Sequence, residues 1–271
     1  MKLLKYFFSA SFVVALVFGN CAGARAQSEI TLLAPVPARE PLNKVLAKFE
    51  AETNYKVKAT YVTGLATRQM VAKGQPLDVN ILLAPFPGAI TSGAVIPSSQ
   101  TVIANFQIGV AVPKGAPKPD ISSAGAVKKA LLAAKSVGFE DPDFTIAGVG
   151  PMEMMNKLGI TEQILPKSKV ALGPGGAGTS PTATAGAIIT FQRLQDGDVD
   201  FAMLLMNEMQ AYKDKFDIVG VLPQKLCPST PMVGVISSHA SDPAAAKALL
   251  QYLASPSAQA IFKDAGFEPH S

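Results

Sequence analysis

The sequence is poor in the residues that build catalytic and metal centres. Its only histidines are His239, near a predicted strand end, and His270, beside the C-terminus. No Ser/His/Asp set and no cluster of His, Cys, Asp and Glu is evident in the sequence. We therefore expect a protein that is not an enzyme and that carries no metal or other cofactor.

Long hydrophobic runs are also lacking, because no segment reaches the ~18 consecutive apolar residues that span a bilayer. The nearest approach is at the start, where Lys2 and Lys5 precede an apolar run from residue 6 to residue 18. The small-residue triplet Ala24-Arg25-Ala26 then follows, which is typical of a cleaved export signal. We expect residues 1–26 to be removed and the protein to be periplasmic or secreted. A lipoprotein beginning at Cys21 is the alternative, although Asn20 is a poor residue before such a cleavage.

Cleavage would also remove most of the apparent basicity. It leaves 21 of the 24 basic residues against 20 acidic ones, without a basic cluster or an interleaved aromatic platform. Nucleic acid is therefore excluded as an expected partner. Only Cys227 remains after cleavage, so no intrachain disulfide can form. Its place in a proline-rich segment indicates a structural residue rather than a nucleophile.

What the sequence does contain is an alternation of short β-type runs and amphipathic stretches, the pattern of helix-covered parallel sheets. Predicted strands cover residues 30–33, 55–61, 79–83, 137–139, 169–172, 201–205, 216–221 and 232–237. Predicted helices cover residues 42–49, 65–73, 124–134, 146–158, 182–195, 243–253 and 256–265.

This order predicts two doubly wound α/β domains. Residues 27–109 with 230–271 form the first and residues 110–229 the second, because the Pro/Gly/Lys-rich segment 112–119 interrupts the alternation. The chain would cross between them near residues 108–112 and 222–231. Such a pair of crossings makes a hinge, and the ligand site of α/β sheets lies where carboxyl ends of strands meet helix N-termini.

The glycine-rich segment 173–180 lies between a predicted strand and a predicted helix, where backbone N–H groups can face an anion. It lacks the Gly-Lys-Ser/Thr ending of a nucleotide loop, and a plain flexible connection is the alternative. Ser180-Pro181 is more specific, because serine at the N-cap and proline at the first position predict a helix start.

Other polar residues follow predicted strands. Arg39 comes after the first strand and could bind a carboxylate or oxyanion, with a solvated arginine as the alternative. Thr63-Gly64 follows the second strand and offers a hydroxyl and an N–H, unless it forms a plain turn. Asp141 could be a ligand or catalytic group, although capping a turn is the commoner role.

Four stretches resemble the type-2 periplasmic solute-binding proteins of ABC importers, in particular the molybdate-binding branch. They are Gly74-Gln75-Pro76-Leu77-Asp78-Val79; Asp141-Pro142 with Ala147-Gly148 and Lys157-Leu158-Gly159; residues 195–200; and the segment 253–262 with Gly266-Phe267. The matches run in order along the chain after residue 26. The resemblance implies a two-domain α/β fold, capture of a small solute and a partner permease at the membrane.

The same resemblance makes molybdate the default ligand but fits the site less well. The serine of the family's first loop corresponds to Pro37, which has neither hydroxyl nor N–H, and a tyrosine corresponds to Leu205. The second-loop serine falls at or near Thr63 or Gly64, while Ala147 and Thr182 could still donate from the backbone.

We therefore predict a monomeric solute-binding protein that captures a small anion, a molybdate-like oxyanion or an organic acid, between its domains. The expected ligand-binding residues are Arg39, Thr63, Gly64, Ala147, Ser180, Thr182 and Asn207. Two rival hypotheses remain open: a secreted enzyme on the same fold, using an acid/base pair such as Asp141 with Glu208, and a sensor module without transport.

Overall fold

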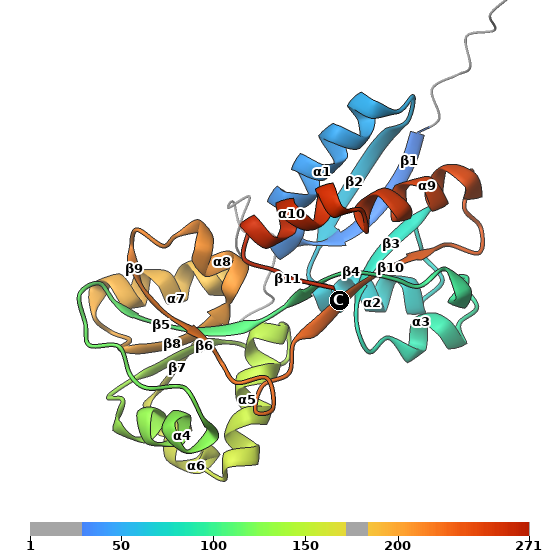
Figure 1. The fold of residues 1–271 in the computed structure, drawn as a ribbon. Helices are drawn as coiled ribbons and strands as arrows, with labels where there is room; N and C mark the ends of the chain where they lie inside the picture. The colour runs from blue at the N-terminus through green and yellow to red at the C-terminus, as the bar shows by residue number, and fades with distance from the viewer. Residues whose placement is uncertain (1–28, 172–183, 271) are drawn as a thin grey trace, which may run out of the picture.

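Two β-sheets with helices on their faces make up the molecule, as the computed structural model shows (Figure 1). The structure describes residues 29–171 and 184–270. The predicted export signal and the whole of the glycine-rich segment lie outside the described residues. No helix of the described part is long and apolar enough to cross a membrane.

The first sheet contains six strands in the order β11-β4-β10-β3-β1-β2 and the second contains five in the order β7-β6-β8-β5-β9. The strands are β1 (Glu29–Pro35), β2 (Lys56–Val62), β3 (Val79–Leu83), β4 (Thr101–Phe106), β5 (Ile108–Pro113), β6 (Val137–Glu140), β7 (Ser168–Ala171), β8 (Phe201–Leu205), β9 (Phe216–Val221), β10 (Thr230–Ile236) and β11 (Glu268–Pro269).

The helices are α1 (Arg39–Glu52), α2 (Gly64–Ala72), α3 (Pro87–Thr91), α4 (Ala124–Ala133), α5 (Ile146–Leu158), α6 (Thr161–Ile164), α7 (Ala185–Asp196), α8 (Met206–Ala211), α9 (Pro243–Leu253) and α10 (Pro256–Asp264). Short 3-10 turns cover Val36–Ala38, Pro97–Ser99 and Leu165–Lys167. The predicted bounds of α5 and α9 are confirmed without change.

Both sheets are mixed rather than parallel. β1, β2 and β3 are parallel, but β10 runs antiparallel between β3 and β4. In the second sheet β5 is antiparallel to both β8 and β9. β4 was not predicted, and residues 108–112, predicted as a crossing between domains, form most of β5. Antiparallel strands need no helix between them, so the alternation of strands and helices did not reveal these two. The chain passes from one sheet to the other at Gln107 and returns between Val221 and Thr230.

Alternate residues of each central strand enter different cores, which is why helices cover both faces. In β1, Leu32 packs with α1, α9 and α10, whereas Leu33 packs with α2 and α3 on the opposite face. In β8, Met203 belongs to the core beneath α4 and α5, and Leu204 to the core beneath α7. Figure 1 shows this layering in both halves.

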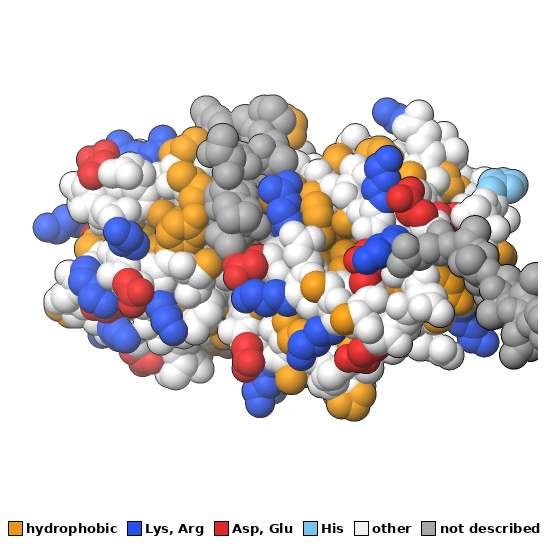
Figure 2. Space-filling view, turned by 90° about the horizontal axis from the view of Figure 1, so that it is seen from above, with side chains coloured by type: hydrophobic (Ala, Val, Ile, Leu, Met, Phe, Trp, Pro, Cys, Tyr) orange, Lys and Arg blue, Asp and Glu red, His pale blue; other side chains and the backbone are white. Residues whose placement is uncertain are grey.

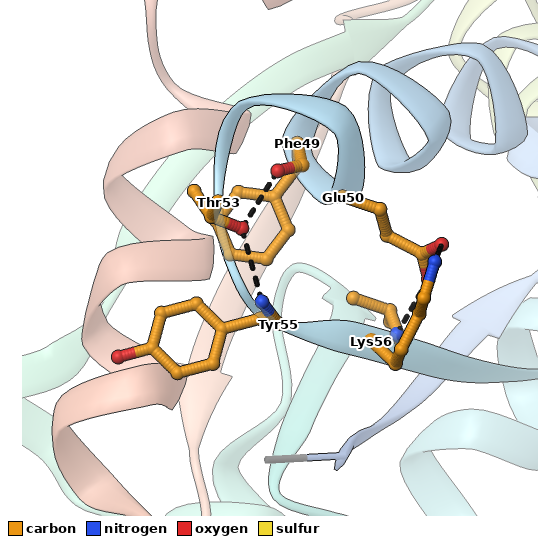
Figure 3. Close-up of polar contacts among 6 residues, drawn as sticks. Phe49, Glu50, Thr53, Tyr55 and Lys56 are labelled. Carbon is orange, nitrogen blue, oxygen red and sulfur yellow. Dashed lines mark hydrogen bonds and ion pairs between the residues drawn. The ribbon is translucent and has the colours of Figure 1, made fainter. Parts of the chain in front are cut away.

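Local hydrogen bonds fix the turn from α1 into β2 (Figure 3). The Thr53 hydroxyl donates to the Phe49 carbonyl at 2.7 Å and accepts from the Tyr55 N–H at 3.3 Å, which ends the helix. Glu50 accepts from the Lys56 ammonium at 2.9 Å as the strand begins. The turn thereby sets where β2, and the loop that follows it, enters the sheet.

Asp78 performs a similar task at the start of β3. Its carboxylate accepts the N–H and hydroxyl of Thr31 at 2.8 and 2.6 Å, and those of Ser241 at 2.7 and 2.9 Å. Burial opposes ionisation, but these bonds outweigh it and hold the pKa of Asp78 below its usual value. The residue therefore ties β1, β3 and the loop before α9 together.

Candidate functional site

The carboxyl ends of the parallel strands of the two sheets face each other. On one side the residues after β1, β2 and β3 meet, and on the other β6 ends next to the start of α8, because β6 and β8 are parallel neighbours. Helices α2, α5 and α7 begin at this place. The backbone groups of loops at such an edge are not used in the hydrogen bonds of the sheet, so they can bind a ligand.

Residues from both halves line a cavity at this edge. Its walls consist of Pro35, Pro37, Thr63, Gly64, Leu83, Phe106, Glu140, Phe144, Thr145, Ile146, Ala147, Thr184 and Leu205. Three hydroxyls and one carboxyl group are set among apolar side chains, and Glu140 is the single charged residue of this described lining. The cavity volume is about 20 Å³, roughly the space of one water molecule. A larger ligand enters only if the two halves move apart.

Three of the predicted site residues come together at this cavity: Thr63, Gly64 and Ala147. The Thr63 side chain is the N-cap of α2 and accepts from Ala66 N at 3.1 Å, which leaves its hydroxyl proton free to donate. Gly64 and Ala147 occupy the first turns of α2 and α5, where backbone N–H groups have no partner within the helix. A Cβ on Gly64 would lie 2.3 Å from Leu83 Cδ1, so a larger residue would require the Leu83 side chain to move.

Arg39 and Asn207 do not line the cavity. The Arg39 guanidinium carbon lies 5.1 Å from the centre of the Tyr61 ring, as in a cation–π contact. The Asn207 side chain donates to the Pro37 carbonyl at 2.8 Å and thereby links the two halves of the molecule. Both positions depend on packing between segments far apart in sequence, which residue spacing does not reveal.

Ser180 and Thr182 lie outside the described residues. The helix predicted to begin at residue 182 begins at Ala185, and its N-cap is Thr184 rather than Ser180. The Thr184 hydroxyl accepts from Ala187 N at 3.1 Å. Both threonine and serine are good N-caps, so local sequence alone did not distinguish the two.

Two buried glutamates meet across Thr184. Its hydroxyl donates to Glu140 Oε1 at 2.8 Å, and its N–H donates to Glu208 Oε1 at 2.7 Å. Glu140 is 1% and Glu208 0% exposed. Among the described residues, the second oxygen of each carboxyl group has no hydrogen-bond partner. This arrangement was not predicted: the enzyme hypothesis paired Glu208 with Asp141, whereas the structure pairs it with Glu140.

Burial dominates the electrostatics of this pair. It raises the pKa of Glu140 to about 7, although the Thr184 hydrogen bond acts in the opposite direction. Burial also raises the pKa of Glu208 well above its ordinary value, and the charge of Glu140 raises it further. Two carboxyl groups this close resist ionising together, so the pair retains a proton near neutral pH.

Glu140 was not among the predicted site residues. The predicted strand ended at residue 139, one residue before the end of β6, and the acidic candidate of this loop was Asp141. Asp141 accepts from the Asp143 N–H at 3.0 Å, in keeping with the turn-capping alternative. The missed signal was an acidic residue directly at the carboxyl end of a buried strand, where α/β sheets place ligand groups.

Two other kinds of chemistry, metal binding and a cysteine nucleophile, can be compared with the described part of the chain. No group of three or more His, Cys, Asp or Glu residues there could hold a metal ion. Cys227 is buried in the connection between β9 and β10, and burial raises the pKa of its thiol to about 11. The thiol is therefore protonated and a poor nucleophile.

Comparison with known proteins places this geometry in a family. Residues 30–268 match the family model described as bacterial extracellular solute-binding protein, and the chain belongs to that family. It is 28% identical over 252 residues to an aconitate isomerase of a Pseudomonas species, covering 91% of this chain and 90% of the relative. It is 25% identical over 261 residues to the molybdate-binding protein ModA of Azotobacter vinelandii, covering 94% and 96%.

The fold is similarly matched. The solved periplasmic molybdate-binding protein of Azotobacter vinelandii superimposes with a TM-score of 0.64 at 16% identity, covering 89% of this chain and all of the other. The predicted resemblance to molybdate-binding-like periplasmic proteins of type 2, and the two-domain α/β fold that it implied, are therefore confirmed. Most members of the family are binding proteins, but the relative named as an isomerase means that membership does not exclude catalysis.

Proposed function

We propose that this protein captures a small organic acid in the cavity between its two sheets and delivers it to an ABC permease. The observation that carries the proposal is the lining itself, which combines hydroxyl and N–H donors with an apolar wall. Thr63, Gly64 and Ala147 supply donors suited to carboxylate oxygens. Leu83 and Phe106 supply a surface suited to a carbon skeleton.

The same lining argues against an inorganic oxyanion. Tetrahedral oxyanions require hydrogen-bond donors on every side, but Pro37 and the side chain of Leu205 have no donor to offer. Each missing charge-assisted hydrogen bond is worth ~1.5–3 kcal/mol, and each 1.4 kcal/mol is about tenfold in affinity. We therefore place organic acids ahead of molybdate for this chain.

Capture requires opening and closing, because the cavity is smaller than any organic acid. We expect rotation about the two connections, near Gln107 and between Val221 and Thr230, with each half moving as a rigid body. A ligand that bridges both halves stabilises the closed form by its differential affinity for that form. Small-angle scattering should then show a smaller radius of gyration at saturation than without ligand. An unchanged radius would contradict the hinge.

Export is part of the proposal. We expect cleavage after Ala26 and a soluble monomer that meets its permease outside the cytoplasm. Acidic and basic side chains are interspersed over the face shown in Figure 2, in agreement with the near-balanced charge of the chain after cleavage. Intact-mass measurement of the exported protein tests the cleavage site, and a lipid on Cys21 would contradict it.

The ligand is tested by native mass spectrometry of the exported protein, followed by calorimetry with citrate, the two aconitates, succinate, molybdate, tungstate and sulfate. We expect a carboxylic acid to bind with a dissociation constant at least 100-fold lower than molybdate. The variant Thr63→Val removes the hydroxyl with little change of shape and should weaken binding, whereas Thr91→Val, on the exposed helix α3, is the matched control. Nanomolar molybdate binding would refute the proposed ligand class.

A further inference from the structure

We propose that the acid captured in this cavity is an amino acid: its ammonium group binds to Glu140, and its carboxylate binds to the hydroxyl and N–H donors at the starts of α2 and α5. This inference rests on the proposed function, because a carboxylic acid must bind in this cavity for it to hold. It goes beyond that function by naming a second group that the ligand carries and the residue that recognises this group.

The first support is a carboxylate oxygen without a partner. Glu140 lines the cavity and is 1% exposed. One of its oxygens, Oε1, accepts from the Thr184 hydroxyl, whereas Oε2 is buried and accepts no hydrogen bond from any described residue. Buried polar atoms nearly always have a hydrogen-bond partner. Since the free oxygen of an ionised carboxylate is an acceptor, the ligand group that completes it is a hydrogen-bond donor.

The second support is the charge of the site. Glu140 and Glu208 are both buried and are joined through Thr184 by hydrogen bonds of 2.8 and 2.7 Å. The described lining of the cavity contains no Lys, Arg or His, and burial raises the pKa of Glu140 with no described cation to lower it. A buried carboxylate normally has an opposite charge beside it. An ammonium group supplies that charge, and its hydrogen bond to a carboxylate is stronger than that of a neutral donor.

The other groups beside Glu140 do not supply a cation either. A Cβ on Gly186 of α7 would lie 3.0 Å from Glu140 Cγ and 3.1 Å from Oε2, so this helix packs an uncharged residue directly on the carboxyl group. Thr145, which precedes α5, donates its hydroxyl to the Asp141 carbonyl at 3.4 Å. The Asp141 side chain accepts from the Asp143 N–H and is itself acidic. Within the described part of the chain, a ligand is therefore the remaining source of a positive charge.

The third support is the placement of donors and acceptor on different walls. Thr63 and Gly64 come from the half that contains β1, whereas Glu140 is the last residue of β6 in the other half. The Thr63 hydroxyl accepts from Ala66 N and keeps its proton for a ligand, and the N–H groups of the first turn of α2 have no partner within the helix. An amino acid carries its carboxylate and ammonium group on one carbon atom. A single small molecule thus bridges both halves, which stabilises the closed form.

The test compares acids that differ in one group. Propionate, lactate and alanine carry hydrogen, hydroxyl or ammonium on the same carbon, and succinate, malate and aspartate form a larger set; each chiral acid is tested as both enantiomers. In calorimetry with the mature wild-type protein, the amino member of at least one set should bind about tenfold or more tighter than its partners, because its hydrogen bond is charge-assisted. If neither set shows that preference while any carboxylic acid binds, ammonium recognition is overturned and capture stands. If no carboxylic acid binds, the proposed function itself is overturned.

The direction of the pH dependence gives a second readout. The pKa of Glu140 is about 7, so below that pH a proton competes with the ammonium group for the carboxylate. The free amino acid keeps both of its charges from pH 5.5 to pH 8, so its affinity should rise roughly tenfold or more over this range. Binding at pH 6 should release close to one proton, measured by calorimetry in two buffers with different ionisation enthalpies. An affinity that stays level or falls with pH would show that Glu140 does not bind the ammonium group as a carboxylate.

The residue itself is tested by Glu140→Gln, which keeps the size of the side chain but cannot ionise. In this variant the preference for the amino member over its hydroxy partner should fall below about threefold, and the pH dependence of binding should disappear. Glu153→Gln, an exposed glutamate of α5, is the matched control and should retain the wild-type preference. A Glu140→Gln protein that is folded by circular dichroism and keeps that preference would remove Glu140 from ligand recognition. If the variant does not fold, the wild-type comparisons of acids and of pH still decide the proposal.

Discussion

The buried glutamate pair should make the protein less stable as pH rises, and Glu140→Gln should remove much of that dependence. The pKa of Glu140 is about 7 in the folded protein and 4.5 without the fold's influence. The folded state therefore binds more protons than the unfolded state between these values. The stability that protonated Glu140 contributes is fully present below pH 4.5 and is lost progressively up to pH 7, because stability falls with pH wherever the native state holds the extra proton.

The size of this stability change follows from the difference between the folded and unfolded pKa values of Glu140. About 2.5 pKa units correspond to roughly 3 kcal/mol at ~1.36 kcal/mol per unit. For a chain of this length, 1 kcal/mol shifts the melting temperature by about 2–4 °C, so the pH-dependent loss is roughly 6–12 °C. The variant also removes the charge that raises the pKa of Glu208. Relative to the wild type, Glu140→Gln should thus gain stability between pH 5 and pH 8.

Thermal unfolding followed by circular dichroism at pH 5, 6, 7 and 8 measures this. At pH 5 the folded site is nearly neutral in both proteins, whereas Glu140 of the unfolded wild type, with a pKa of 4.5, is already mostly ionised. The change in their difference from pH 5 to pH 8 therefore reports the titration of Glu140, because a packing difference does not vary with pH. The exposed Glu153→Gln variant should follow the wild type at every pH. Equal pH dependence of Glu140→Gln and the wild type would refute the assignment of a raised pKa to Glu140.

Three further substitutions test other parts of the structure. Asp78→Ala removes the acceptor of four hydrogen bonds and should cost about 3–5 kcal/mol in urea unfolding, with Asp78→Asn losing less; an unaffected midpoint would contradict the network. Gly148→Ala would place a Cβ 2.4 Å from a backbone carbonyl oxygen and should destabilise the fold by several kcal/mol, whereas a Cβ on Gly125 meets nothing within 4 Å and Gly125→Ala should be neutral or stabilising by up to ~1 kcal/mol. Asn207→Ala breaks the link to the Pro37 carbonyl, so without ligand the scattering radius should increase; an unchanged radius would show that this bond does not hold the halves together.

Much of the fold was predictable because its helices and strands depend on residues that are close together in the sequence. The bounds of α5 and α9 followed from hydrophobic periodicity together with capping residues, Thr145 before one helix and Asp242 before the other. Buried strands such as β3 and β8 followed from short apolar runs. β4 and β5 were missed because the chain runs from one sheet into the other through Gln107 with no helix between them, and each strand pairs antiparallel with partners far along the chain.

The same distinction applies to the candidate site: residues whose place depends on neighbouring sequence could be predicted, and residues whose place depends on distant contacts could not. Thr63, Gly64 and Ala147 could be placed because each follows a strand or begins a helix, and strand ends of α/β sheets meet at a known edge. Arg39 reached Tyr61, and Asn207 reached Pro37, through contacts that span the fold. No spacing rule predicts such contacts.

The class of fold and the edge of the sheets expected to bind a ligand could be predicted from residue patterns, because periodicity, caps and turn residues act over a few neighbouring positions. Which side chains share that edge depends on how distant segments pack together. Glu140, Thr184 and Glu208 are 44 and 24 residues apart along the chain, and each is an ordinary polar residue when taken alone. Burial raises the pKa of both carboxyl groups, and the charge of Glu140 raises the pKa of Glu208 further, since desolvation and repulsion depend on three-dimensional distance.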